Sequence, residues 1–195
     1  MIPHPKKQEP PMKRRDLLVM SGAVLAVGCS SSGTADPAAK RREIDAEVDN
    51  ALAQLYGSAS GSRELVAKSR GVLVFPKVLS AGFMVGGSYG AGALRKGGTT
   101  SGYYSVAQGS VGLLAGAQQK SMYVLFMSDE ALHKFEASSG WTVGADAGVA
   151  LVDVGAEARV DTETMKAPII GYVRSNTGFM ANLSLDGTKF NKLDL

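Results

Sequence analysis

The glycine content of the middle of the chain is the strongest constraint on its fold. Sixteen of the 24 glycines lie within residues 71–155, where the apolar residues otherwise indicate β-strands. Glycine weakens a strand and suits places where backbones approach closely or a sheet bends. Even numbering places four glycines on one face of an unbroken strand, namely Gly82, Gly86, Gly90 and Gly92. The pattern predicts a sheet coiled into a barrel-like shape. A shallow groove that holds an acyl chain or a peptide along bare backbone is the alternative.

Two helices are predicted before this region. Asp36 and Pro37 form a favourable helix start, and residues 37–56 follow with apolar side chains at the spacing of one helix face. These are Ile44, Val48, Ala51, Leu52 and Leu55. A second, short helix is predicted over Ser62–Arg70, with Ser62 as its N-cap and Gly71 as its stop.

Short strands, separated by turns, are predicted from Gly71 onward. Arg95–Gly98 is typical of a hairpin turn, and Met122–Met127 is apolar on both faces, which indicates a central strand. Ser128 caps a helix that runs to about Ala137, and the Asp186-Gly187 turn leads to a short tail. The predicted strands are Val72–Pro76, Phe83–Leu94, Ser101–Gln108, Gly112–Ala117, Met122–Met127, Thr142–Val154, Ala156–Asp161, Ile169–Arg174 and Phe179–Leu185. The predicted fold class is therefore α+β, with a predominantly antiparallel sheet, two N-terminal helices and one inserted helix.

Residues 1–28 have the layout of a secretory signal peptide. Lys13–Arg15 is basic, and Leu17–Val27 is an apolar run that is shorter than the roughly 20 residues a membrane-spanning helix needs. Small residues then lead to Cys29, the only cysteine, and this end resembles the bacterial lipobox, although Ala26 stands where Leu is usual. The resemblance implies lipid attachment at Cys29, and an ordinary cleaved signal is the alternative.

The segment after Cys29 indicates how the domain is connected to its proposed anchor. Residues 29–36 are small and polar, which favours a flexible linker, and residues 37–195 then form a single domain. By resemblance to bacterial sorting rules, Ser30 favours delivery to the outer membrane, on its periplasmic side. Retention at the inner membrane and secretion are less favoured alternatives.

Charge outside the signal peptide is balanced. The formal net charge of the chain is +3, and residues 1–28 account for all of it, so no nucleic-acid partner follows from composition. The basic clusters Lys40, Arg41 and Arg42, and Arg95 and Lys96, are candidate contacts to anionic lipid headgroups. A solvated helix face of alternating charges and an ordinary hairpin tip are the respective alternatives.

One motif suggests catalysis. Gly86–Gly90 matches G-x-S-x-G, the nucleophile elbow of serine esterases, with Ser88 as nucleophile. The motif needs a strand, a sharp turn and a helix, and the residues after Gly90 are a poor helix start. His133 and Asp129 share one predicted helix, without an evident route to Ser88. One cysteine and two histidines leave little for a metal site. We expect no catalytic residue, no metal and no cofactor, with the serine esterase as a remote alternative.

From about Ile44 to the C-terminus, the chain resembles the SYLF (Ysc84-like) family, as a bacterial, lipid-anchored member. The blocks that carry the resemblance are Gly71–Pro76, Gly82–Gly90, Gly109–Leu113, Gly116–Gln118 and Phe135–Asp146. The resemblance implies membrane-lipid binding without enzyme activity. The phosphoinositide and actin binding of eukaryotic members is not carried over, because a bacterial periplasm offers neither partner.

These observations predict a membrane-anchored phospholipid-binding domain of the bacterial cell envelope. The apolar stripe of Ile44–Leu55 would enter the acyl boundary beside the basic cluster Lys40–Arg42, or it would pack on the domain's own sheet. The alternative function is a structural or assembly role, in which a sheet edge docks an unidentified envelope protein.

Overall fold

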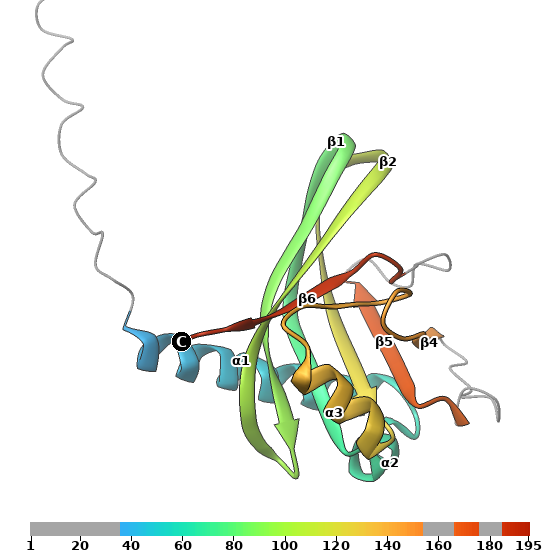
Figure 1. Cartoon of the computed structure of the whole chain (residues 1–195). Helices are drawn as coiled ribbons and strands as arrows, with labels where there is room; N and C mark the ends of the chain where they lie inside the picture. Colours follow the sequence, from blue (N-terminus) through green and yellow to red (C-terminus); the bar gives the residue numbers. More distant parts are fainter. Residues whose placement is uncertain (1–35, 154–165, 176–184) are drawn as a thin grey trace, which may run out of the picture. The chain divides into compact units, whose positions relative to one another are not determined.

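The computed structural model describes residues 36–153, 166–175 and 185–195, with residues 83, 84, 110–117 and 153 described by their backbone alone. Pro37–Leu195 forms one compact unit. Its elements are α1 (Pro37–Ser58), α2 (Ser62–Lys68), β1 (Gly71–Lys96), β2 (Thr99–Phe126), α3 (Asp129–Ala137), β3 (Trp141–Thr142), β4 (Ala150–Asp153), β5 (Ile169–Ser175) and β6 (Lys189–Leu193). The predicted class is confirmed, because this unit is α+β with a mostly antiparallel sheet curled into a half-barrel (Figure 1).

A single long hairpin dominates the sheet. β1 and β2 pair in antiparallel from Gly71↔Phe126 to Lys96↔Thr99, around a turn whose Gly97 and Gly98 have φ of 56° and 85°. Positive φ at both positions suits glycine and the twist of a tight hairpin, so the predicted turn is confirmed. The separate strands predicted before and after this turn are wrong. They merge because β-bulges bend the strands without ending them.

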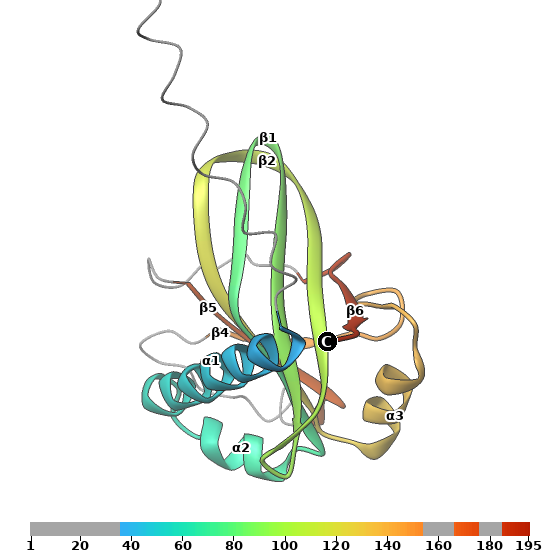
Figure 2. The same cartoon turned by 90° about the vertical axis from the view of Figure 1, so that its left-hand side faces the viewer.

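The hairpin folds over on itself, as Figures 1 and 2 show at the end that carries the labels β1 and β2. The side-chain oxygens of Ser80 and Ser88 lie 2.7 Å apart, which brings the first half of β1 against its second half. A Cβ on Gly90 would lie 2.6 Å from the Lys77 carbonyl oxygen, and one on Gly92 would clash with the Val74 carbonyl. The predicted coiling is confirmed, and the strand's own backbone covers the glycine face at Gly90 and Gly92.

The remaining strands extend the sheet from β2. Its second half pairs with β5, and its first half pairs with β6, which also pairs with β3. Met122–Phe126 therefore lies between β1 and β5, as predicted for a central strand. β4 joins the other edge of β5 in parallel.

Not all of the strands predicted in this half form as predicted. The strand predicted over 142–154 is wrong as a unit, because only β3 and β4 form and a turn with Gly144 at φ 86° separates them. β6 replaces the predicted tail. The strand predicted over 156–161 lies outside the described residues, as does 179–184 of the last one.

The helices cover different faces of the sheet. α1 buries the predicted stripe of Ile44, Val48, Ala51 and Leu55 in a cluster with residues of β1, β2 and β5. The Tyr123 hydroxyl fixes this packing by donating to the Ala51 carbonyl at 2.9 Å. α3 contributes Leu132 and Phe135 to a second cluster, rich in aromatic rings, on the other side. The stripe of α1 is thus core, which corrects its suggested use at an acyl boundary.

The N-caps predicted for α2 and α3 are partly confirmed. Ser128 caps α3 by accepting from the Ala131 amide at 3.2 Å, as predicted. Gly61, in the left-handed region, is the N-cap of α2 in place of Ser62. The buried Ser62 hydroxyl instead donates to the carbonyls of Leu55 and Ala59, which joins α2 to the end of α1.

Candidate functional site

The first basic cluster lies in the first turns of α1, where Arg41 and Arg42 are exposed. Lys40 pairs with Glu43 at 2.9 Å, and Arg41 donates to the Pro37 carbonyl at 3.4 Å. Both are contacts within one helix, and exposed pairs of this kind are weak. The cluster therefore faces solvent and could meet an anionic surface.

The second basic pair is engaged inside the fold. Arg95 is only 12% exposed and its guanidinium lies 2.8 Å from the Asp49 carboxylate and 3.5 Å from that of Asp45. Lys96 pairs with Glu136 of α3 at 2.8 Å. Both residues were predicted as headgroup contacts. In the structure, Arg95 contacts α1 and Lys96 contacts α3. Their contacts join the end of β1 to α1 and to α3.

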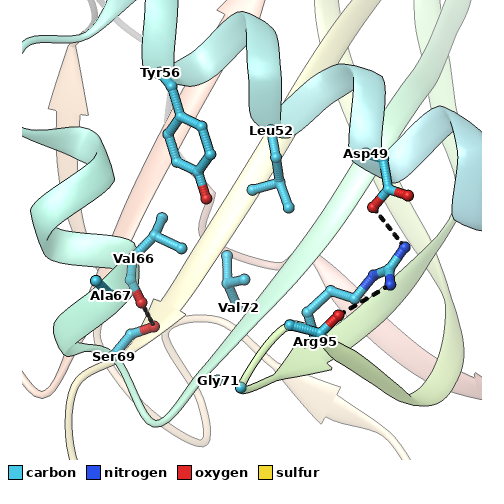
Figure 3. A pocket seen from close by; sticks show the side chains of 11 residues that line it. Asp49, Leu52, Tyr56, Val66, Ala67, Ser69, Gly71, Val72 and Arg95 are labelled. Carbon is cyan, nitrogen blue, oxygen red and sulfur yellow. Dashed lines mark hydrogen bonds and ion pairs between the residues drawn. The ribbon is translucent and has the colours of Figure 1, made fainter.

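A cavity of about 300 Å³ lies beside Arg95, between α1, α2 and the hairpin turn. Leu52, Tyr56, Val66 and Val72 line its apolar part, with Asp49 and Arg95 at one end (Figure 3). Burial raises the pKa of Tyr56, an effect that the nearby Arg63 guanidinium partly opposes. The two carboxylates beside Arg95 neutralise its charge, so this cavity offers no strong attraction to a phosphate.

Ser88 does not lie on a nucleophile elbow. It occupies the interior of β1, with strand on both sides, so the strand–turn–helix that the motif needs does not form there. Its hydroxyl contacts Ser80, while Asp129 and Glu130 form ion pairs with Arg70 and Lys134. In the described part of the chain, no three His, Cys, Asp or Glu side chains gather as metal ligands.

An exposed apolar surface on β1 is the feature that sequence reasoning missed. Three of the four large exposed apolar side chains among the described residues are Leu79 at 60%, Val85 at 70% and Tyr89 at 58%. Residues 78–94 and 101–119 contain no Asp, Glu, Lys or Arg. The sequence does indicate this surface, because odd-numbered apolar residues alternate with even-numbered glycines along this stretch. We define Leu79, Val85 and Tyr89 as the tip surface, after the folded-over end of the hairpin (Figure 2).

None of the helices in residues 36–153, 166–175 and 185–195 has the length and apolar character needed to cross a membrane. No curated protein matches the chain. A family model does match residues 107–194, which run from the middle of β2 through β6. This part of the chain is similar to the Ysc84 family, whose model is described as Las17-binding protein actin regulator.

Proposed function

We propose that the protein is a lipid-anchored, non-enzymatic domain of the bacterial cell envelope that binds membrane phospholipid. The tip surface carries the proposal. Large apolar side chains that are exposed along one uncharged stretch of strand often mark a contact with a partner or a membrane. The similarity of residues 107–194 to the Ysc84 family supports the same function.

Electrostatic attraction from Lys40, Arg41 and Arg42 is the second part of the proposal. Basic residues near an anionic membrane surface contribute about 1 kcal/mol each. Arg95 and Lys96 stand apart from this role, since their charges are balanced by carboxylates of α1 and α3.

Vesicle co-sedimentation of a protein that begins at Ala35 tests the proposal. The core clusters of the described residues draw only on Ile44–Leu195, so this part holds its own core. Binding to phosphatidylglycerol vesicles should exceed binding to phosphatidylcholine vesicles. The difference should shrink when Lys40, Arg41 and Arg42 are changed to Gln, or at high salt, because exposed charges are screened beyond about 8 Å at physiological ionic strength. Failure to bind any vesicle would remove phospholipid binding.

The anchor is a separate part of the proposal. Cys29, which lies outside the described residues, would carry the acyl groups on the periplasmic side of the outer membrane. Two or more acyl chains hold a protein stably at a bilayer, whereas one holds it marginally. Intact mass of protein extracted from membranes should exceed that of the chain from Cys29 onward by the acyl mass, and Cys29→Ala should abolish the increase. A water-soluble product without added mass would contradict the anchor.

Docking of an envelope protein is the second candidate function. Among the described strands, β1 pairs only with β2, and an edge that no strand of the chain pairs with is where a strand from a partner would add. Crosslinking in cells should then give one partner in constant proportion. Crosslinks spread over many proteins would favour phospholipid binding.

A further inference from the structure

The folded-over end of the hairpin has an inverted arrangement of polar and apolar side chains. Between Lys77 and Gly90, the described residues of β1 alternate without exception, and the odd-numbered positions are the exposed ones. They include all three residues of the tip surface, whereas the even positions are at least partly buried. Each half of β1 therefore turns its even face toward the other half.

The enclosed face carries polar contacts. Ser80 and Ser88 bond to each other between the two halves of β1. The Lys120 ammonium donates to the Gln108 side-chain oxygen at 3.3 Å, which joins the two halves of β2 at the same level. Burial lowers the pKa of Lys120, as expected for an ammonium held away from water. Along this part of β1, the large apolar side chains face outward and the two serines face inward, which is the reverse of the usual arrangement of a sheet in water.

We infer that the folded-over end of the β1–β2 hairpin inserts into the acyl boundary of a phospholipid bilayer through Leu79, Val85 and Tyr89. The inference rests on the proposed function and specifies which surface carries it. Transfer of apolar side chains from water to hydrocarbon is favourable in proportion to their exposed area. Tyr89 adds a ring with a polar end, a combination that is enriched where a bilayer meets water.

A bilayer fits this surface better than a protein partner does. No charged residue occurs in 78–94 or 101–119, so the end lacks the charges by which protein surfaces select one another. In sequence, residues 29–36 separate the proposed anchor from α1, and eight residues reach at most about 28 Å. An anchored domain would therefore stay close to a bilayer.

The test compares vesicle binding of two variants of the protein that begins at Ala35. The first combines Leu79→Ser, Val85→Ser and Tyr89→Ser. The second, a matched control, is Leu151→Ser on β4, the fourth large exposed apolar residue in the part of the chain that the structure describes. With vesicles of phosphatidylethanolamine and phosphatidylglycerol, the triple variant should lose about tenfold or more of the apparent partition constant. The control should bind like the wild type.

A second measurement detects insertion directly and does not need the triple variant to fold. Leu79→Trp places a fluorophore on the tip surface, while the native Trp141 is 3% exposed and gives a constant background. Lipids with brominated acyl chains should quench the added Trp and shift its emission to the blue. Leu151→Trp should respond to neither.

Each outcome decides a different claim. If the wild type binds no vesicle, the proposed function fails and the inference fails with it. If the wild type binds, while the triple variant binds equally and the Leu79→Trp emission is unchanged, only the inference is overturned. Unchanged vesicle binding together with loss of self-association or of a crosslinked protein in the triple variant would assign the tip surface to a second copy or to a protein partner.

Discussion

The guanidinium of Arg95 lies 2.8 Å from the Asp49 carboxylate, and this ion pair joins the turn end of the β1–β2 hairpin to helix α1. The same guanidinium also donates to the Asp45 carbonyl at 3.2 Å. Asp45 in turn accepts hydrogen bonds from Thr100 and Tyr103 at the start of β2. A residue predicted to face lipid therefore belongs to a network that positions the first helix.

Arg95→Met should lower the free energy of unfolding by about 1–3 kcal/mol, because it removes charge-assisted hydrogen bonds from a nearly buried position. Urea denaturation of the purified domain measures the change. Lys96→Met is the matched control and should cost no more than about 1 kcal/mol, since its ion pair with Glu136 is more exposed. Equal losses in the two variants would contradict an internal role for Arg95.

Gly92→Ala should destabilise the domain by about 1–3 kcal/mol or more, because the added methyl meets the Val74 backbone in the folded-over hairpin. Gly109→Ala, in the same hairpin, has open space around the new Cβ and should change stability by no more than about 0.5 kcal/mol. Thermal denaturation followed by circular dichroism compares the two. The fold-back of β1 would be wrong if both variants behaved alike.

Alkaline pH should unfold the domain through its buried tyrosines. Burial raises the pKa of both Tyr123 and Tyr172, so the folded state holds their protons more tightly than the unfolded state. Their contribution to stability is complete below the ordinary tyrosine pKa of about 10 and is lost as pH rises through the raised values. Tyrosinate absorbance and circular dichroism should change together above that pH.

Single substitutions separate the tyrosines. Tyr123→Phe removes one group that ionises on unfolding and should weaken the alkaline transition, while costing about 1 kcal/mol at neutral pH through loss of the bond to Ala51. Tyr89→Phe, on the exposed tip surface, should leave both properties unchanged. A larger alkaline effect at Tyr89 would argue against the buried assignment of Tyr123.

Ser88 should have no hydrolytic role. Its hydroxyl is hydrogen-bonded to that of Ser80 within β1. Nucleophilic catalysis would instead require a base within hydrogen-bond reach. Hydrolysis of short-chain nitrophenyl esters by the wild type should match that by Ser88→Ala and stay at the background rate. Activity in the wild type that Ser88→Ala abolished would establish the esterase instead.

Much of the fold follows from local sequence rules. The spacing of Ile44, Val48 and Leu55 predicts both α1 and its buried face, and Ser128 marks the start of α3. The continuity of β1 is harder to predict, because Pro76 and the glycines resemble strand ends. In the structure, Pro76 falls in the bulge between Phe75 and Val78, where its missing N–H is tolerated. Long-range pairing with β2 decides the outcome there.

The exposed surface on β1 is harder to predict from the sequence than the fold is. The even-numbered glycines are conspicuous in the sequence, but the exposed large apolar residues are the odd-numbered Leu79, Val85 and Tyr89. A strand in which small and large residues alternate can turn its large residues either into the core or toward the solvent. Only the fold-back, visible in the Ser80–Ser88 contact, determines which face is enclosed. Likewise, the partners of Arg95 come from α1, and nothing in its local sequence indicates them.

The hairpin register also constrains the order in which the chain can fold. Pairing that begins at Lys96↔Thr99, next to the turn, can extend step by step to Gly71↔Phe126 without closing a new loop at each step. β5 and β6 pair with the other edge of β2 and lie much farther from it in the sequence, so each must close a longer loop. We expect the rate-limiting barrier of folding to include the turn at Gly97 and Gly98 and the ribbon beside it, with docking of the C-terminal strands on the native side of the transition state.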